Sequence, residues 1–506
     1  MPSIKKSFAL MLALLLVATV FVSCKTDNTE TSKPAGETSE TVSKADPLEH
    51  LKGHDFQKAE IVFLVEGDHR LLYRSSEVLG SEVAPDVINE AVDARNKRVE
   101  ELLNITIKEF RTDASTSMVD LVRTSANIGD NAYDVVMPYI PDAAAMLTEG
   151  FLSDLNKFDI FRFENDYWDG NANKYFSVGG KLFFATSDMT LLAFDCTHAL
   201  VFNKTVLNRF EIQENPYDLV KEGKWTLDKL LEMAALVTSE TDGDNQMTYK
   251  DTWGFFVNNN YATSLFLGSG QTLTGRNAND MPTLALETNA AAAADVVGKI
   301  VDAFSNERTT LLIESFIDQA TAAGSNCWAE ATKAFAENRV LFRSLAIIDM
   351  NDLADFEVNY GILPTPKINE AQENYHSFVS TLYASCLAIP ARLDTKDRSA
   401  IVIEAMSAAS VDVKDKYYDV LLKGRRIVDE DSSEMLDIIF NNRIYDLGVI
   451  YGWGGENTWD PNTLGNFINE IAKSGQNTFA STYATIEGAV KAAMQQTIET
   501  IEAIDF

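Results

Sequence analysis

Short apolar runs and amphipathic segments alternate through the first part of the chain. Residues 59–67 (AEIVFLVEG) form a mostly apolar run that closes in Glu-Gly, which predicts a buried strand followed by a loop. Residues 85–103 carry apolar positions at helical spacing, and Pro85 suits the first turn of a helix. Residues 104–110 (NITIKEF) and 133–137 (YDVVM) again predict strands. This alternation of strand and helix predicts parallel βα units and therefore an α/β domain.

Helical patterns dominate the chain from Trp225 onward, with single strands between them. Before this point, Gly179 and Gly180 lie between two apolar segments and predict a hairpin turn. Thr226 precedes the amphipathic run LDKLLEMAALVT and is the expected N-cap of a helix. The remaining patterns predict helices at residues 291–304, 326–340, 395–409 and 482–504, and strands at residues 340–348, 359–366 and 381–393.

The N-terminal segment differs from the rest of the chain. A lysine pair at residues 5–6 precedes residues 8–22, which are uncharged and mostly apolar. This segment is short for a transmembrane helix but has the length of a signal-peptide core, so residues 1–23 are the predicted signal peptide. The segment ends in Phe-Val-Ser-Cys, which resembles the lipobox of bacterial lipoproteins with Phe where Leu is usual. The resemblance implies that Cys24 is lipidated; a plain secretory signal with a nearby cysteine is the alternative.

Residues 24–55 are the predicted lipidated cysteine and flexible tether. The part from Lys25 to Lys44 has no aromatic residue and is dense in Thr, Ser and Glu, so it cannot bury enough apolar surface to fold. No later segment reaches the roughly 18 consecutive apolar residues that a membrane span needs. The sequence therefore predicts a globular body held at the outer face of a membrane by the N-terminal lipid.

Composition and charge narrow the range of functions. Lys and Arg total 43 against 75 Asp and Glu, a formal net charge of −32 at pH 7. Such a surface repels phosphate backbones and anionic headgroups, so we expect no nucleic-acid partner. The cysteines of the body, Cys196, Cys327 and Cys386, lie far apart among apolar or aromatic neighbours. We expect buried free thiols, with one disulfide plus one free thiol as the alternative.

Several blocks then line up, in order, with one family. They are YDVVMPYIPDAAAMLTEGFLSDLNKF, VGGKLFFATSDMTLLAFDCTHALVFNKTVL, GKWTLDKLLEMAALVT, NYGILPTPK and AIPARLDTKDRSAIVIEAM. Each block alone is weak, but their order and spacing resemble the extracellular solute-binding proteins of family 1, carbohydrate type. Members of this family are the receptor components of ABC importers. The resemblance covers nearly the whole body, from about Ala59 to the C-terminus.

The resemblance implies an α/β fold of the two-lobe, type II periplasmic-binding-protein kind. Lobe 1 would comprise residues 59–189 plus 362–409, and lobe 2 residues 190–361 plus 410–506. Crossing hinge strands would lie near residues 187–192, near residues 359–364 and near Ala409, with the ligand cleft between the lobes. Closure of the lobes would capture a solute, most often an oligosaccharide in this family, and the closed form would dock on the permease. No cofactor is required by this function.

Candidate ligand contacts follow from the chemistry of sugars. A sugar has apolar faces and hydroxyl edges, so its cleft needs aromatic rings and Asp, Glu, Asn or Arg at strand ends and lobe crossings. Gly452, Gly454 and Gly455 are expected to shape a loop that exposes Trp453. Trp225 and Trp253 match structural positions of the family and are expected in the core. The candidate ligand-binding residues are Glu66, Tyr139, Asp188, Arg343, Tyr383 and Trp453.

An acidic segment at residues 240–251 (ETDGDNQMTYKD) can be aligned with the twelve-residue EF-hand loop. Oxygen ligands at alternate positions let a tight turn wrap a hard cation, and Asn245 would take the position where Gly is usual. The departures are Glu at the first position, Asn at the sixth and Asp at the twelfth. The candidate ligands of a structural Ca²⁺ are Glu240, Asp242, Asp244, Gln246 and Asp251. The alternative is an acidic turn without a metal.

Motifs for enzyme chemistry are missing from the sequence. There is no HExxH or GxSxG motif, and VGGKL at residues 178–182 lacks the first glycine and the Ser/Thr of a P-loop. A glycoside hydrolase needs only two carboxylates, which 75 acidic residues could supply, so a lipid-anchored hydrolase acting on glycans is the alternative function. We expect a binding protein rather than an enzyme, with a carbohydrate solute, permease subunits and the membrane as its partners.

Overall fold

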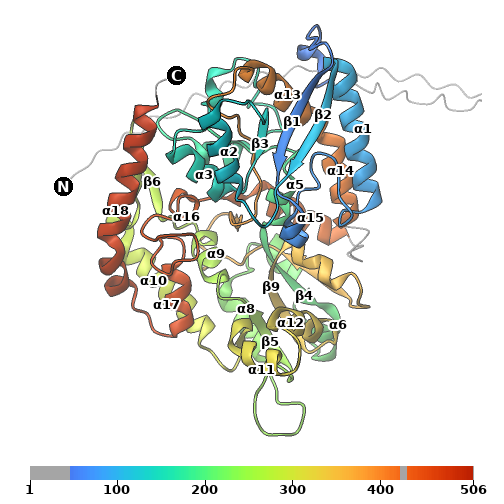
Figure 1. The fold of residues 1–506 in the computed structure, drawn as a ribbon. Helices are drawn as coiled ribbons and strands as arrows, with labels where there is room; N and C mark the ends of the chain where they lie inside the picture. Colours follow the sequence, from blue (N-terminus) through green and yellow to red (C-terminus); the bar gives the residue numbers. More distant parts are fainter. Residues whose placement is uncertain (1–45, 422–429, 505–506) are drawn as a thin grey trace, which may run out of the picture. The chain divides into compact units, whose positions relative to one another are not determined.

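The first sheet has the parallel arrangement that the sequence predicts. In the computed structural model, which describes residues 46–421 and 430–504, strands β1 (Ala59–Val65), β2 (Ile105–Arg111) and β3 (Val135–Met137) are all parallel, in the order β2-β1-β3. Figure 1 shows this sheet with α1 (Asp86–Leu103) on one side and α2 (Met118–Ile128) and α3 (Ile140–Thr148) on the other. The predicted signal peptide, Cys24 and most of the tether lie outside the described residues.

Local sequence explains these elements. In α1 one stripe of residues, Ile88, Val92, Val99 and Leu103, is buried, and the helix ends where Asn104 takes a left-handed conformation (φ 49°) that asparagine tolerates better than most residues. In α2 the Ser117 side chain caps the first turn by accepting a hydrogen bond from the backbone N–H of Asp120.

A second, mixed sheet has the strand order β10-β4-β9-β5-β8. Strand β4 is antiparallel to β10 and β9, whereas β5 is parallel to β9 and β8. The strands are β4 (His198–Asn203), β5 (Trp253–Val257), β8 (Thr310–Leu312), β9 (Val340–Ala346) and β10 (Tyr360–Leu363). The helices of this part are α6 (Lys204–Arg209), α7 (Pro216–Lys221), α8 (Leu227–Ala235), α9 (Tyr261–Gly268), α10 (Leu286–Phe304), α11 (Ile317–Ala322) and α12 (Cys327–Ala336).

The remaining elements are helices and two short strand pairs outside these two sheets. They are α4 (Gly170–Phe176), α5 (Leu191–Asp195), α13 (Lys396–Ala409), α14 (Val411–Asp419), α15 (Glu430–Asn441), α16 (Leu447–Ile450), α17 (Phe467–Ser474) and α18 (Phe479–Ala503), with the short strand pairs β6 (Thr274–Arg276)–β7 (Pro282–Leu284) and β11 (Ser377–Phe378)–β12 (Arg443–Ile444). None of the helices within the described ranges is long and apolar enough to cross a membrane.

Several local predictions are confirmed. Gly179 and Gly180 both have positive φ (60° and 73°) and turn the chain between Val178 and Lys181, although these flanks form a single bridge rather than two strands. The Thr226 hydroxyl caps α8. The three cysteines of the body are buried and free, and Trp225 and Trp253 are buried.

Two segments expected to be strands take another form. Residues 381–393 form no regular strand, because their backbone bonds to one neighbour after another: Cys386 N–H to Pro138 O, Leu387 N–H to Ala185 O and Ala388 N–H to Val136 O. A segment with such scattered partners cannot build a ladder with one strand. The crossing expected near residues 187–192 is a turn followed by the short helix α5.

Candidate functional site

Three tyrosines from distant parts of the chain pack together. The rings of Tyr73 and Tyr383 are stacked with centroids 4.1 Å apart, and the ring of Tyr139 meets Tyr383 edge-on at 5.4 Å. The Tyr139 hydroxyl also donates a hydrogen bond to the backbone oxygen of Tyr73 (3.0 Å). Leu192 and Ile348 pack against these rings. We call Tyr73, Tyr139 and Tyr383 the tyrosine cluster.

The elements that carry this cluster come from both sheets. Tyr139 directly precedes α3, two residues after β3 ends, and Tyr73 ends a 3-10 turn (Asp68–Tyr73) that follows β1. Ile348 lies in the 3-10 turn that follows β9 in the second sheet, and Leu192 lies in α5. Tyr139, Leu192 and Ile348 form a small buried apolar cluster, and Tyr73 and Tyr383 pack both against it and against the main core. The tyrosine cluster therefore lies where segments from the two sheets meet.

Polar groups lie beside the aromatic rings. Glu66 is 2% exposed, and its Oε2 accepts hydrogen bonds from Arg70 Nε (2.9 Å) and Thr112 Oγ1 (3.0 Å). Its Oε1 has no hydrogen-bond partner among the described residues. The Arg70 guanidinium lies 5.3 Å from the centroid of the Tyr139 ring. Burial, and then the charge of Glu66, raise the pKa of the Asp142 carboxyl to about 6. The site thus combines aromatic faces with a free buried acceptor and a cationic donor.

A close backbone contact positions the loop that carries Tyr73. At Gly67 a Cβ atom would lie 1.9 Å from the backbone oxygen of Thr112, so no other residue fits without a shift. The Gly67 N–H donates to the Thr112 hydroxyl (3.1 Å). Further along, Leu71 has φ 56° and ψ −118°, an unfavourable conformation for a branched residue, and is 69% exposed.

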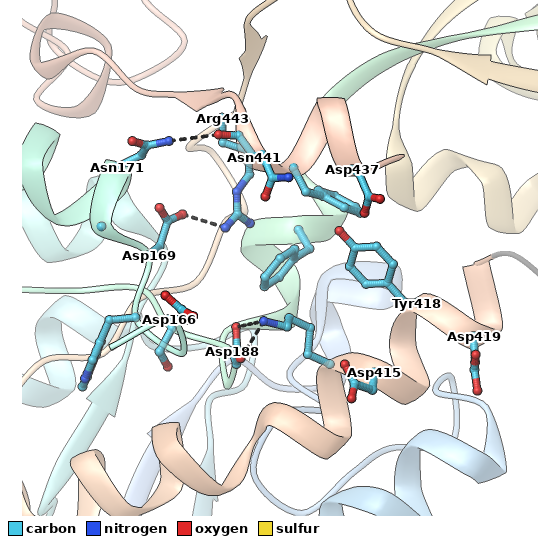
Figure 2. Close-up of a pocket in the computed structure, with 16 residues that line it drawn as sticks. Asp166, Asp169, Asn171, Asp188, Asp415, Tyr418, Asp419, Asp437, Asn441 and Arg443 are labelled. Carbon is cyan, nitrogen blue, oxygen red and sulfur yellow. Dashed lines mark hydrogen bonds and ion pairs between the residues drawn. The ribbon is translucent and has the colours of Figure 1, made fainter. Parts of the chain in front are cut away.

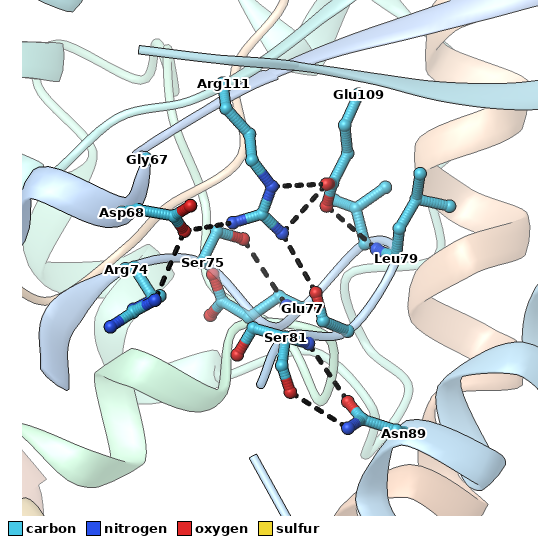
Figure 3. A network of polar contacts seen from close by, with 12 residues as sticks. Gly67, Asp68, Arg74, Ser75, Glu77, Leu79, Ser81, Asn89, Glu109 and Arg111 are labelled. Carbon is cyan, nitrogen blue, oxygen red and sulfur yellow. Dashed lines mark hydrogen bonds and ion pairs between the residues drawn. The ribbon is translucent and has the colours of Figure 1, made fainter. Parts of the chain in front are cut away.

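Charged side chains hold the same loop against β2 (Figure 3). Arg111 pairs with Glu109 (2.9 Å) and Asp68 (3.6 Å) and donates to the backbone oxygen of Gly80 (2.9 Å). Arg74 pairs with Asp68 (3.3 Å) and donates to the backbone oxygen of Leu71 (2.8 Å). These contacts fix both ends of the turn, so Tyr73 is held in place from the side opposite the other two tyrosines.

Arg343 lies on β9 in the second sheet rather than in the tyrosine cluster. Its side chain is buried, and its Nε and Nη1 have no hydrogen-bond partner in the described part of the chain. Burial lowers the pKa of the guanidinium, an effect opposed by the charges of Asp349 and Asp352. Burial, and then the charge of Asp349, raise the pKa of the Tyr73 hydroxyl. Asp349 thus lies close enough to influence both the predicted Arg343 and the tyrosine cluster.

The expectation that the glycine-rich loop exposes Trp453 is wrong. Trp453 is 2% exposed, its Nε1 donates to Thr497 Oγ1 of α18 (3.0 Å), and its ring stacks on Tyr451 (centroids 5.5 Å apart). The positive φ of Gly454 (103°) turns the loop inward, which the sequence could not specify. The exposed tryptophan of this loop is Trp459, at 61%.

The segment around Trp453 nevertheless borders an open space. Residues 450–458, α3 and α18 line a cavity of about 330 Å³, to which Pro141, Ala144 and Thr148 contribute from α3. Tyr139, which precedes α3, does not line this cavity. The role of Trp453 as a ligand contact stays a prediction.

Asp188 lies in a different cavity from the tyrosine cluster. This cavity has a volume of about 800 Å³, and in it Lys414 Nζ approaches Asp188 Oδ2 to 2.7 Å (Figure 2). Burial raises the pKa of the Asp188 carboxyl to about 6, an effect opposed by the Lys414 charge. Helix α5 lies between the two sites: Leu192 contacts the tyrosine cluster, and Phe194 lines the cavity. The structure thus brings together Glu66, Tyr139 and Tyr383 and separates Asp188 from them.

The sequence did not single out Tyr73 and Arg70. Both lie in the segment HRLLYRSS, which has neither a strand nor a helix period and no motif. The only available signal was the turn after β1, since loops at the carboxyl ends of parallel strands commonly carry binding residues.

The acidic loop at residues 240–251 brings some of its predicted ligands together. Carboxylate oxygens of Glu240, Asp242 and Asp244 lie within 4.8 Å of one another on the surface. Asn245 has the left-handed conformation (φ 62°) that the sixth position requires.

Another predicted ligand of that loop, Asp251, is engaged by the backbone. Asp251 is buried, and its two carboxylate oxygens accept hydrogen bonds from the N–H groups of Thr241 (2.7 Å) and Thr248 (2.8 Å). The Gln246 N–H donates to Asp244 Oδ1 (2.7 Å). Three carboxylates therefore fit a hard cation, while Asp251 would have to exchange its present partners. Calcium binding stays a prediction.

Comparison with known proteins identifies similar chains. A family model described as bacterial extracellular solute-binding protein matches residues 91–411, which is more than half of the chain. Among curated proteins, none is significantly similar in sequence.

Solved structures of solute-binding proteins share the fold. A cyclo/maltodextrin-binding protein complexed with maltotetraose is 14% identical with a TM-score of 0.53, covering 89% of this chain and 99% of that one. RafE from Streptococcus pneumoniae is 13% identical with a TM-score of 0.53, covering 87% and 98%. An ABC substrate-binding protein from Listeria monocytogenes in complex with cycloalternan is 13% identical with a TM-score of 0.50, covering 88% and 99%. These matches show the two-lobe α/β fold of periplasmic-binding-protein type for this chain.

Proposed function

Because the chain belongs to the family of bacterial extracellular solute-binding proteins, we propose that it is the receptor of an ABC importer and that its solute is an oligosaccharide. The family places the protein outside the cytoplasm and makes it a binding protein. The proposal adds three points to this family assignment: the class of solute, the permease as partner and the attachment to the membrane.

The tyrosine cluster with Glu66 carries the proposal of a sugar. Tyrosine rings offer flat apolar surfaces for the faces of a sugar ring, and they order at low conformational cost. Glu66 Oε1 is a buried acceptor without a partner in the described ranges, and a sugar hydroxyl would satisfy it. Arg70, which already contacts both Glu66 and the Tyr139 ring, supplies donors beside it.

The similar folds support the same class of solute. The titles of two solved structures name maltotetraose and cycloalternan, which are both saccharides. With identities of 13–14%, these proteins share the fold with our chain, and they do not identify its solute. The residues of the tyrosine cluster therefore remain the main support.

Solute binding at this place requires movement. Tyr73 and Tyr383 are stacked at 4.1 Å, which leaves no room for a sugar ring between them. We infer that the loop of Tyr73 shifts, or that the lobes separate, before the solute enters, and that closure then packs Leu192 and Ile348 around it. A closed, solute-filled receptor would be the form that the permease recognises.

Attachment to the membrane is the last part of the proposal. The lipobox-like sequence at Cys24 and the Thr/Ser/Glu-rich tether support a lipid anchor at the extracytoplasmic face. A tether of this composition keeps the body within reach of a permease while allowing it to turn freely.

A binding screen with matched variants tests the receptor function. We expect one or more neutral oligosaccharides from a panel that includes maltotetraose and raffinose to raise the melting temperature of the full chain in a saturable way. Tyr383→Ala should weaken that binding about tenfold or more, since losing one aromatic platform is worth roughly 1.4 kcal/mol or more. Trp328→Ala, an exposed aromatic on α12, is the control and should bind as the wild type does. If the panel gives no shift while a peptide library does, the solute class is wrong although the receptor function stands.

A further inference from the structure

The cavity that contains Asp188 has the features of a second binding site. It measures about 800 Å³, and its wall includes Asp169, Asp188, Lys414, Tyr418, Asp437 and Arg443. We call it the aspartate cavity. We propose that it binds a neutral polyhydroxylated ligand, a saccharide or sugar alcohol, independently of the tyrosine cluster. This goes beyond the proposed function, which places the transported solute at the tyrosine cluster.

Four separate segments build the aspartate cavity. Asp169 is the N-cap of α4, and its Oδ1 accepts from the backbone N–H of Ala172 (3.0 Å). Asp188 lies in the turn before α5, Lys414 and Tyr418 lie on α14, and Arg443 opens the short strand β12. Figure 2 shows Asp169, Asp188, Tyr418 and Arg443 arranged around the same space. The wall is thus assembled by the fold rather than by one acidic stretch of sequence.

Two ion pairs give this wall a fixed geometry. Arg443 Nη2 lies 2.7 Å from Asp169 Oδ2, with both side chains 8% exposed, and the Arg443 guanidinium stacks 4.0 Å from the centroid of the Phe194 ring. Lys414 Nζ lies 2.7 Å from Asp188 Oδ2. Buried, paired groups of this kind hold their orientation, which is what a preorganised binding site needs.

Arg443 has donors that the protein does not use. Its Nε and Nη1 have no hydrogen-bond partner within the described residues, although the side chain is more than nine-tenths buried. A buried guanidinium N–H without an acceptor destabilises the fold, because the group has lost its hydrogen bonds to water without gaining others. Because Arg443 lines the cavity, a ligand oxygen placed there would satisfy these donors. This unsatisfied group is the observation that distinguishes the cavity from an ordinary acidic surface.

The charges on the wall select the class of ligand. The carboxylates of Asp166, Asp415 and Asp437 add to the two ion pairs, so the wall is acidic overall and repels anions. A cation would pair with these carboxylates, but it would leave the Arg443 N–H donors without an acceptor and would be repelled by the positive charge of Arg443. A hydroxyl group both donates and accepts, so a neutral polyol can bond to the carboxylates and to Arg443 at once. The partly buried ring of Tyr418 offers an apolar face for a sugar ring.

The aspartate cavity is separate from the tyrosine cluster. Leu192 and Phe194 are two positions apart on α5, which is about 200° around a helix, so they face opposite sides. Leu192 packs against the tyrosine cluster, while Phe194 lines the cavity and contacts Arg443. The two sites therefore share none of these side chains, and substitutions can address each site alone.

Binding measurements on the full chain test this inference. Maltotetraose and raffinose are titrated by calorimetry into the wild type, Tyr418→Ala, Asp437→Asn and Tyr383→Ala, with Trp328→Ala as the control. We expect a second saturable binding event in the wild type. Tyr418→Ala and Asp437→Asn should weaken this event at least tenfold and leave the other unchanged, and Tyr383→Ala should do the reverse.

Other outcomes overturn the inference. A single event that responds only to Tyr383→Ala means that the aspartate cavity binds no sugar, and the proposed receptor function then stands unaffected. If spermidine binds to the wild type and binds more weakly to Asp437→Asn, the site takes cations, and the proposed polyol class is wrong. If sugar binding responds only to Tyr418→Ala and Asp437→Asn, the aspartate cavity is confirmed and the placement of the transported solute at the tyrosine cluster is wrong.

Discussion

Glu77 joins three segments at the centre of the described body. Its carboxylate accepts hydrogen bonds from the Ser385 hydroxyl (2.6 Å) and the Leu192 N–H (3.0 Å), and it is 1% exposed. Burial raises the pKa of Glu77 to about 7, although these two bonds oppose the shift. Since Leu192 and Ser385 belong to the segments beside the tyrosine cluster, the protonation of Glu77 bears on how firmly those segments are held.

The raised pKa of Glu77 predicts a pH dependence of stability. Between about pH 4.5 and pH 7 the folded chain keeps the Glu77 proton while the unfolded chain releases it, so the unfolding free energy falls as the pH rises through this window. Asp142, Asp188 and Asp446, whose pKa values are raised to about 6, act in the same direction. We expect Glu77→Gln to remove a decline of roughly 3 kcal/mol, measured by urea unfolding from pH 4.5 to 8. Glu307→Gln, at an exposed position, is the control; an unchanged slope in Glu77→Gln would contradict the assignment.

Gly67 is a second position where one atom decides the geometry. A methyl group there meets the Thr112 backbone oxygen at 1.9 Å, so Gly67→Ala should displace the start of the loop that carries Tyr73. We expect a loss of stability of about 1–3 kcal/mol by urea unfolding, together with weaker sugar binding. Gly488→Ala is the matched control, because no atom lies within 4 Å of its added methyl group and helix α18 gains about 0.5–1 kcal/mol. Equal effects of the two substitutions would show that Gly67 does not position the loop.

At the scale of elements, the acidic loop at residues 240–251 carries the prediction of calcium. If the converging carboxylates of Glu240, Asp242 and Asp244 bind Ca²⁺, excess Ca²⁺ should stabilise the chain by about 2.7 kcal/mol at a hundred times the dissociation constant. Differential scanning fluorimetry with Ca²⁺ and with EDTA measures this shift. Asp242→Asn should abolish the shift, and Asp318→Asn, on the exposed side of α11, should retain it. A shift of the same size in Asp242→Asn would exclude this loop as the site.

Which elements could be predicted depends on the range of the interactions that form them. The strand β1 and the helix α1 follow from local patterns, because β1 is a mostly buried apolar run and α1 buries one stripe of residues at helical spacing, whichever elements cover them. Residues 381–393 have the composition of a strand, but their hydrogen-bond partners are segments from about 200 to 250 residues earlier in the chain. A pattern of apolar residues contains no information on such partners. The prediction of a regular strand at residues 381–393 is therefore wrong.

At the scale of the whole molecule, the order of the sequence blocks indicates which segments come near one another, but it does not indicate the direction of their side chains. Glu66, Tyr139 and Tyr383 come together because the carboxyl ends of parallel strands meet at one edge and the return segment passes over it. Asp188 lies only four residues before Leu192, yet its side chain, in the turn before α5, lines the other site. Side-chain direction at a crossing depends on how the two sheets are placed, which the order of sequence blocks does not specify.

The location of the molecule depends on Cys24, and this can be tested apart from ligand binding. If the lipobox-like sequence directs lipidation, the wild-type chain should be found in the membrane fraction and Cys24→Ala should be released or retained with an uncleaved signal segment. Mass spectrometry of the N-terminal peptide should then find the lipid on Cys24 of the wild type only.

A second cysteine provides the control for this experiment. Cys327→Ala removes a buried thiol of the body and should leave the chain in the membrane fraction. Since Cys24 precedes the folded body, which begins before the predicted end of the tether because Leu48 and Leu51 are buried in the core, Cys24→Ala should also keep the wild-type affinity for whichever sugar the wild type binds. Wild-type protein that appears in the medium without lipid would instead support a plain secretory signal, and receptor and permease would then have to meet by diffusion alone.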